Sequence, residues 1–367
     1  MLVKKKVIQI VEDLKVGGME NVVFNISRGL SKLEYEIEVW CLAGGGLVAD
    51  ELATYGVCVR VLGISSYHRP TSMLALVRLL RTSRPDIVHT RGYFAGTAGR
   101  IAAICAGVPS IFHHVHSTYW GYGRRKLIIE WILALLTRKI VCISQAVESF
   151  VLNVEKIPRA RVLVIYNGIE KPVPGIGCLS RLRESLGLAG QCAIVTTVAS
   201  LTPHKGHKYL LLAAAEVLKR FGRCQFLIVG DGPERNDLED LAGRLGISQH
   251  VIFAGIRRDI PQLIALTDIF VLPSCIREGL GIAVIEAMAQ GKAAIGSSLG
   301  GIVEVISDSV SGVLVPPEDH VSLSAAIERL LRDPEERGRM GCQGYALFLE
   351  KFTASMMISQ IEDLYRD

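Results

Sequence analysis

Apolar runs of strand length alternate along this chain with longer segments in which apolar residues recur at helical spacing. This alternation predicts buried strands joined by amphipathic helices. In the first half, the predicted strands are residues 7–11, 37–41, 57–62, 87–89, 110–113, 140–143 and 162–166, and the predicted helices are residues 19–30, 73–81, 97–106 and 124–138. The second half repeats the pattern, with predicted strands at residues 193–199, 226–229, 251–253, 269–272, 293–296 and 313–315. Strands that are apolar on both faces indicate parallel sheets covered by helices on both sides.

Residues 167–177 separate the two halves and are rich in proline and glycine, which favours a linker. A chain of 367 residues is also longer than one core usually supports. We therefore expect an α/β fold with two facing Rossmann-like doubly wound domains, and a ligand in the interdomain cleft beyond the carboxyl ends of the strands. Residues 334–365 form an amphipathic helical pattern. The expected boundaries are an N-terminal domain over 1–170, a linker over 171–177, a C-terminal domain over 178–350, and a last helix over 351–367 that could cross to the N-terminal domain.

Composition narrows the class of protein. Half of the residues are apolar and 21% are charged, which is typical of a globular protein with large cores. No apolar run is long enough to span a bilayer, and Lys4, Lys5 and Lys6 precede only a strand-length apolar run, unlike a secretory leader. These patterns favour a cytoplasmic protein. The nine cysteines are scattered without CxxC pairs and predict reduced core thiols. A net charge of +5 suits anionic nucleotides or lipids but is too small to indicate nucleic-acid binding.

The strongest chemical pattern is a pair of glutamates, Glu278 and Glu286, with seven residues between them. Glu278 lies in a Gly-rich turn after the strand 269–272, and Glu286 lies on the following helix. Carboxylates accept hydrogen bonds from vicinal sugar hydroxyls, and the helix start near residues 279–282 offers N–H groups to a phosphate. The pair alone would favour an ordinary strand–turn–helix with one exposed and one satisfied carboxylate.

The surrounding sequence resembles the EX7E element of retaining GT-B glycosyltransferases, most closely those of glycosyltransferase family 4. The resemblance covers almost the whole chain, and its motifs are specific through their order and spacing. They are the GGxE turn at 17–20, the strand ends at 86–89, 142–144 and 164–169, the KG loop at 203–206, the segment resembling vGdGp at 229–233, the GGxxE turn at 300–304 and the segment 312–317.

The resemblance implies a retaining, metal-independent hexosyltransferase that needs no cofactor. The implied donor is a nucleotide-diphosphate sugar, with UDP favoured and GDP possible, and the implied acceptor is a glycan or lipid-linked glycan of a cell-surface polysaccharide. Glu286 is expected to bind the donor ribose, Glu278 the donor hexose, and Lys205 the diphosphate as it leaves. A fixed cation stabilises the negative charge that grows on a leaving diphosphate. The other expected donor-binding residues are Gly17, Gly18, Ser200, Gly230, Gly279, Leu280 and Gly281.

One position departs from the family pattern. Ser200 stands where the family often has an arginine, so one expected cation is missing. Arg257, Arg258 or His204 could replace that cation in space. The Gly17–Gly18 turn suits close approach of backbone N–H groups to a phosphate or sugar, and the absence of GxGxxG argues against a dinucleotide dehydrogenase.

Three histidines end a strand of the first half, at His113, His114 and His116. Alternation places His114 and His116 on one face and His113 on the other. With no carboxylate or cysteine nearby in sequence, we expect no metal site. The resemblance assigns His116 to the donor sugar or the acceptor, as a catalytic and acceptor-binding residue, whereas His113 and His114 are expected to pack.

Residues 124–138 combine a basic start with a long apolar stretch that is too short to cross a bilayer. This segment could lie on an anionic membrane or simply cover the sheet as an ordinary helix. Tyr119 and Trp120 precede it, and they could stack on an acceptor sugar or support a membrane-proximal acceptor face. The expected localisation is cytoplasmic, with peripheral contact at the inner face of the cell membrane as an open alternative.

Two other functions remain open on the sequence. One is a sugar-nucleotide epimerase or hydrolase on the same frame. The other is a non-catalytic subunit that binds a sugar nucleotide, which Ser200 alone favours. The presence of Glu278, Glu286 and Lys205 favours an enzyme.

Overall fold

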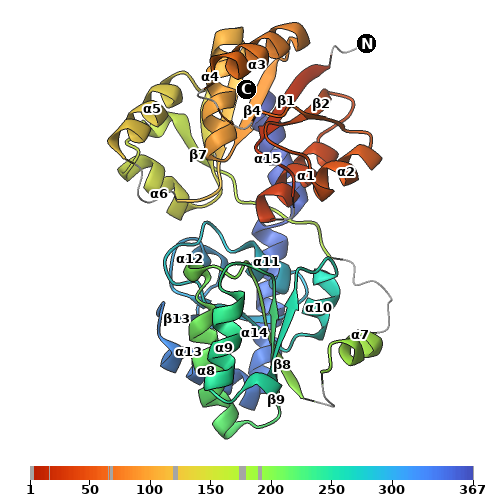
Figure 1. Ribbon diagram of the computed structural model, residues 1–367, viewed down its shortest axis with the longest axis vertical. Coiled ribbons are helices and arrows are strands. Elements are labelled where there is room, and N and C mark those ends of the chain that lie inside the picture. The colour runs from red at the N-terminus through yellow and green to blue at the C-terminus, as the bar shows by residue number, and fades with distance from the viewer. Residues whose placement is uncertain are drawn as a thin grey trace. The chain divides into compact units, whose positions relative to one another are not determined.

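The computed structural model describes residues 4–15, 17–64, 66, 69–118, 123–172, 179–188 and 192–366. The chain forms two compact units (Figure 1). The first comprises Met1–Glu170 together with Thr353–Asp367, and the second comprises Lys171–Phe352. Of the linker expected at 171–177, residues 173–177 lie outside the described residues.

The first unit is built on a parallel sheet with the strand order β3-β2-β1-β4-β5-β6-β7. Its strands fall at the seven sequence-predicted positions, with ends that differ by a few residues. Their bounds are β1 (Lys5–Val11), β2 (Tyr35–Cys41), β3 (Cys58–Val61), β4 (Ile87–Arg91), β5 (Ser110–Val115), β6 (Lys139–Cys142) and β7 (Val162–Val164).

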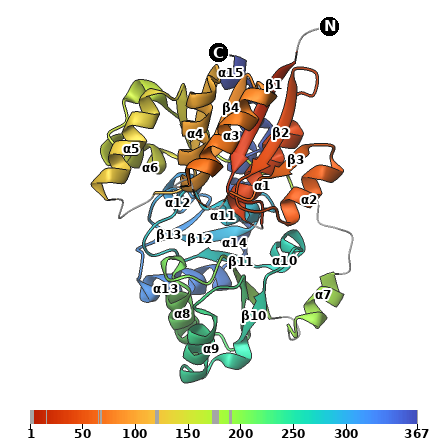
Figure 2. The ribbon, with the colours of Figure 1, turned by 45° about the horizontal axis from the view of Figure 1, so that its top comes forward.

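Helices cover both faces of this sheet because each strand turns apolar side chains to both sides. Ile8 and Ile10 of β1 pack on one face against helices α3 and α4, and Val11 packs on the other against α1 and α2 (Figure 2). The helices of this unit are α1 (Gly18–Gly29), α2 (Leu47–Thr54), α3 (Pro70–Ser83), α4 (Tyr93–Ala106), α5 (Arg124–Leu135), α6 (Gln145–Asn153) and α15 (Ala354–Arg366).

The second unit holds a parallel sheet with the strand order β10-β9-β8-β11-β12-β13. Its strands are β8 (Ala193–Val198), β9 (Cys224–Val229), β10 (Val251–Gly255), β11 (Ile269–Leu272), β12 (Ala293–Ser297) and β13 (Gly312–Val315). Its helices are α7 (Leu179–Ser185), α8 (His207–Arg220), α9 (Arg235–Arg244), α10 (Ile260–Leu266), α11 (Ile282–Met288), α12 (Ile302–Val305), α13 (His320–Arg332) and α14 (Pro334–Lys351).

Both sheets reverse their strand order once, between β1 and β4 in the first unit and between β8 and β11 in the second. At such a point the loops beyond the carboxyl ends of two neighbouring strands run in opposite directions and leave room for a ligand. The expected fold class, two Rossmann-like α/β domains, is confirmed. Within the described residues, no helix has the length and apolar character needed to cross a membrane.

The helical pattern over 334–365 comprises two helices, α14 and α15, and α15 falls within the last helix expected over 351–367. Thr353 forms a parallel bridge with Ile169, and the N–H of Ala354 donates to the Ile169 carbonyl at 2.8 Å. This backbone pairing takes Thr353 out of helical geometry. The chain therefore leaves the second unit at Phe352, and α15 belongs to the first.

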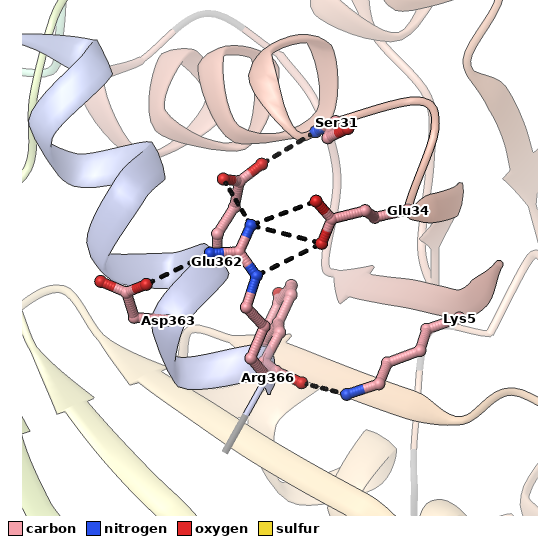
Figure 3. Close-up of polar contacts among 7 residues, drawn as sticks. Lys5, Ser31, Glu34, Glu362, Asp363 and Arg366 are labelled. Carbon is pink, nitrogen blue, oxygen red and sulfur yellow. Dashed lines mark hydrogen bonds and ion pairs between the residues drawn. The ribbon is translucent and has the colours of Figure 1, made fainter. Parts of the chain in front are cut away.

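Helix α15 is fixed to the first unit by polar contacts at its end (Figure 3). Arg366 pairs with Glu34 at 3.2 Å, and the Glu362 carboxylate accepts from the backbone N–H of Ser31 at 3.0 Å. Lys5 donates to the carbonyl of Tyr365 at 2.7 Å. The apolar side of α15 is buried, so the last residues of the chain complete the core of its first domain.

The cysteines differ partly from expectation. The eight described cysteines are free thiols, and Cys41, Cys142 and Cys224 are buried as expected. Cys58 and Cys105 are exposed, as is Cys342, so the assignment of all of them to the cores was wrong. Scattered spacing identifies unpaired thiols but carries no information on burial.

Candidate active site

The loops after β8 and β11 meet at the point where the strand order of the second unit reverses. The N–H of Cys275 donates to the carbonyl of His204 at 2.9 Å. Gly206 has φ +69, and a Cβ there would lie 2.0 Å from the carbonyl oxygen of Pro273. Only glycine allows this approach, which explains the KG sequence and brings Lys205 close to the loop that holds Glu278.

Lys205 and Glu278 form a direct ion pair across this junction. The Lys205 Nζ lies 2.6 Å from Oε2 of Glu278, and Ser274 Oγ donates to the same oxygen at 2.8 Å. The side chains of Lys205 and Glu278 are 19% and 12% exposed, so both charges are largely shielded from water. Such a pair is held firmly yet remains accessible to a ligand that exchanges partners with it.

The GGxxE turn packs against the backbone of the loop that holds Glu278. The N–H of Gly301 donates to the carbonyl of Glu278 at 3.0 Å. A Cβ at Gly300, where φ is +55, would lie 2.2 Å from that same carbonyl oxygen, and a Cβ at Gly301 would lie 2.3 Å from the carbonyl oxygen of Gly279. These glycines therefore set the position of residues 278–280.

We expect Gly301→Ala to displace this loop. The added methyl meets backbone atoms that cannot rotate away, so the free energy of unfolding should fall by about 1–3 kcal/mol. Urea denaturation measures this loss. The control is Gly338→Ala, since a Cβ there meets nothing within 4 Å and alanine is the better helix former. Equal stability of the two variants would contradict the assignment of a supporting role to Gly301.

Glu286 lies on α11, the helix that leaves the Glu278 loop. Its carboxylate is half-buried and has no hydrogen-bond or ion-pair partner in the described part of the chain. Burial raises the pKa of Glu286 to about 7. An unpaired, shielded carboxylate is costly unless a ligand supplies donors to it, so its environment is typical of a binding site.

The loops after β8 and β9 complete this edge of the sheet. Gly230, at φ +132, passes so close to residue 199 that a Cβ would lie 2.0 Å from the Ala199 carbonyl oxygen. Ser200 is exposed, and its Oγ lies 3.3 Å from Thr202 Oγ1. The structure thus brings Ser200, Lys205 and Gly230 together with residues 278–281 on three adjoining segments of the second unit.

The three residues that could replace the cation missing at Ser200 do not supply a positive charge beside Lys205. Arg257 is already paired with Asp259, at 2.8 and 2.6 Å, and Arg258 is exposed on the same loop after β10. Burial and the charges of Lys205 and Arg277 lower the pKa of His204, which keeps its ring neutral near pH 7. None of these three groups offers a free buried cation beside Lys205.

Arg277 is a residue that the sequence reasoning missed. It is half-buried, directly precedes Glu278, and has no hydrogen-bond or ion-pair partner in the described residues. Its charge lowers the pKa of His204, the residue directly before Lys205, so Arg277 lies at the same loop junction as Lys205. The signal was a basic residue directly before the first glutamate of the EX7E element.

The remaining predicted residues belong to the first unit. Gly17 directly precedes α1, and a Cβ on it would lie 2.3 Å from Oε2 of Glu20, so the Glu20 side chain folds back over the turn. Burial raises the pKa of Glu20. Gly17 and Gly18 therefore lie at the carboxyl end of β1, where the strand order of this sheet reverses. Tyr119 and Trp120 lie outside the described residues.

The histidines at the end of β5 form a buried network. His113 Nδ1 lies 3.0 Å from Thr90 Oγ1, whereas His114 Nδ1 lies 2.8 Å from Nη1 of Arg91. A guanidinium can only donate, so His114 accepts at Nδ1 and carries its proton on Nε2. The His114 ring stacks on His116 with centroids 4.4 Å apart. The sequence prediction that His113 is separate from the other two is consistent with these contacts.

His116 is half-buried, and neither ring nitrogen has a hydrogen-bond partner among the described residues. Burial, and then the charge of Arg91, lower the pKa of His116 well below its usual value. The ring is therefore neutral at neutral pH and can both donate to and accept from a hydroxyl. In the described residues, no three histidine, cysteine or carboxylate side chains are placed to hold a metal ion.

Comparison with known families decides what kind of protein carries these loops. The model for Glycosyltransferase Family 4 matches residues 16–171, and the model for Glycosyl transferases group 1 matches residues 180–347. The two matches together cover nearly the whole chain, one in each unit. The chain is a family 4 glycosyltransferase. This family is retaining and generally independent of metals.

Relatives of this glycosyltransferase match it over its full length. The UDP-Gal:alpha-D-GlcNAc-diphosphoundecaprenol alpha-1,3-galactosyltransferase of Escherichia coli is 28% identical over 96% of this chain and 94% of its own. The structure of Anabaena HepE in complex with UDP and glucose superposes with a TM-score of 0.87 at 23% identity and covers 99% of both chains. The outer core galactosyltransferase WaaB of lipopolysaccharide gives a TM-score of 0.72 at 19% identity, over 98% of this chain and 99% of its own. These structures establish the GT-B fold.

Proposed function

We propose that this glycosyltransferase moves a hexose from a UDP-sugar to a lipid-linked glycan in the assembly of a cell-surface polysaccharide. The observation that carries the proposal is the Lys205–Glu278 pair at the strand-order reversal of the second unit, with the unpaired carboxylate of Glu286 on the next helix. The donor and acceptor in the name of the Escherichia coli relative, and the UDP and glucose bound to HepE, support the substrate classes.

In this proposal, the ribose hydroxyls donate to Glu286 and satisfy its empty acceptor positions. The hexose hydroxyls donate to Glu278, and the diphosphate takes Lys205 away from that carboxylate. Negative charge grows on the diphosphate as the anomeric C–O bond breaks, so Lys205 stabilises the transition state more than the ground state. Gly17, Gly18 and the neutral ring of His116 are assigned to the sugar and the acceptor.

We further assign to Arg277 the cation that Ser200 does not supply. Arg277→Gln is expected to weaken UDP binding by about tenfold, since a hydrogen bond between charged groups is worth about 1.5–3 kcal/mol and this one is partly exposed. Isothermal calorimetry measures the change. Arg258→Gln is the matched control on a neighbouring loop and should bind UDP as the wild type does. If the control loses as much affinity as Arg277→Gln, the assignment fails.

The proposed donor is tested by thermal unfolding with EDTA present. A ligand bound only by the native state raises the melting temperature, and at a hundred times its dissociation constant it adds about 2.7 kcal/mol. We expect UDP and a UDP-sugar to raise it and GDP-sugars not to. A higher melting temperature with GDP-mannose alone would show that the donor base is guanosine and not uridine. No change with any nucleotide sugar would refute the proposal.

The acceptor class and the alternative functions are tested by measuring which products the enzyme forms from the donor. Sugar appearing in a lipid extract supports transfer. Free sugar or an epimer formed from the donor alone would indicate a hydrolase or epimerase, and binding without any turnover would indicate a non-catalytic subunit.

A further inference from the structure

Helix α5 is oriented with its apolar face outward. Six of the nineteen exposed large apolar side chains in the described part of the chain fall within nine consecutive residues of this region: Ile128, Ile129, Trp131, Ile132, Leu135 and Leu136. Their exposed fractions run from 37% to 57%. The sequence of this helix suits either a cover for the sheet or a membrane contact, but an ordinary covering helix would bury these residues.

A buried ion pair on the inner side of α5, beside Leu133 and Ala134, fixes this orientation. Glu130 is 4% exposed and pairs with Arg100 of α4, which is fully buried. The other oxygen of Glu130 accepts from Thr97 Oγ1 at 3.1 Å. Turning the apolar face inward would break this buried pair and leave both charges unpaired, at a large cost. The buried ion pair therefore determines that the apolar face of α5 points outward.

Charge lies at one end of the same face. At 100° per residue, Arg124 and Arg125 fall on the side of the helix that carries the six apolar residues, and both are exposed. Lys126, on the other side, lies over the Tyr93 ring at 4.7 Å. Trp131 lies in the middle of the apolar face. A helix with exposed apolar and tryptophan side chains flanked by arginines is typical of segments that lie in a lipid–water interface.

We propose that the outward face of α5 docks this enzyme on a membrane surface that contains anionic phospholipids. The apolar side chains enter the headgroup region, and Arg124 and Arg125 contact the lipid phosphates. Views of the first unit place α5 at its outer edge (Figure 1 and Figure 2). The inference stands on this face alone and does not depend on which donor the second unit binds.

The test is co-sedimentation of the full-length protein with vesicles of phosphatidylcholine alone or mixed with phosphatidylglycerol. The wild type should bind the mixed vesicles at least about tenfold more tightly, and added salt should weaken the binding. The Trp131 emission, taken as the difference between the wild type and Trp131→Phe, should shift to the blue on binding. No binding to mixed vesicles would overturn the proposal.

A double variant, Ile128→Ser with Ile132→Ser, should lose about tenfold or more of the vesicle affinity, since each removes an apolar side chain from the lipid. Leu33→Ser with Ile256→Ser is the matched control, because both side chains are exposed, at 80% and 73%, and lie elsewhere. Unchanged melting temperatures show that each variant folds. Equal vesicle binding by both doubles would refute the proposal. A dimer of the wild type in sedimentation equilibrium that the first double abolishes, without vesicle binding, would assign the face to a second copy.

Discussion

Lys205→Met is expected to lower the rate of sugar transfer by about 10²–10³-fold, the usual effect of removing one group that stabilises the charge of a transition state. Affinity for the intact UDP-sugar should fall much less, because the charge on the diphosphate grows only as the glycosidic bond breaks. The reason lies in the site: Lys205 is the group that faces Glu278 at 2.6 Å and is largely shielded from water. The measurement is UDP formation with a membrane extract that supports turnover by the wild type.

Lys208→Met is the matched control for this prediction. Lys208 lies on the same segment but is exposed, with its ammonium over the Tyr209 ring at 4.7 Å. We expect its turnover to remain close to that of the wild type. If Lys205→Met turns over within a few-fold of the wild type, the leaving diphosphate is stabilised elsewhere, and the role given to Lys205 is wrong.

Glu286→Gln is expected to stabilise the protein and to weaken donor binding at the same time. The pKa of Glu286 is about 7 in the native state against an ordinary 4.5. A carboxyl group with a raised native pKa favours folding below pH 4.5, and this contribution is lost as the pH rises through 7. Glutamine does not titrate. Its advantage in free energy of unfolding should therefore grow with pH, up to about 3 kcal/mol at pH 8, at about 1.4 kcal/mol per pKa unit.

The affinity for UDP should fall in Glu286→Gln, although the stability of the protein rises. Ribose hydroxyls donate to the charged carboxylate, so the affinity of the wild type for UDP should rise as the pH increases through 7. Glu286→Gln should bind UDP about 10–100-fold more weakly at pH 8, since it loses a charged acceptor worth about 1.5–3 kcal/mol. Urea denaturation and calorimetry at pH 5.5 and pH 8 measure the two effects.

Glu328→Gln distinguishes this behaviour from that of an ordinary buried carboxylate. Glu328 is 6% exposed and pairs with Arg220 at 2.9 Å, so its replacement should destabilise the protein at both pH values. UDP binding should be unchanged in that variant. A Glu286→Gln protein that is no more stable than the wild type at pH 8 would show that Glu286 already has a partner.

The sequence was sufficient for the sheets because every strand is a short apolar run between polar segments. It was weaker for helices of eight or nine residues: α2 and α6 were not predicted, since so few turns give little periodic signal. The break between α14 and α15 depends on pairing of Thr353 with Ile169, 184 positions earlier, which no local pattern carries.

The candidate site shows the same division. Glu278, Glu286 and Lys205 were identified because the family motifs mark them, and the glycines around them follow from close backbone contacts. Arg277 and Arg91 were missed, since what distinguishes them is spatial: one lacks a partner, and the other is a fully buried guanidinium whose described partners are neutral. A one-dimensional pattern cannot separate such residues from ordinary surface arginines.

The path of the chain through its two units has a consequence for biosynthesis. The second unit is continuous from Lys171 to Phe352, whereas the first needs Thr353–Asp367 to cover its core. As the ribosome releases the polypeptide, the later domain can therefore close before the earlier one. The N-terminal half must wait, with the surface that α15 covers still open, until Thr353–Asp367 have left the ribosome. Removal of residues 361–366, which include the buried Ile361 and Tyr365, would leave the core of that half incomplete.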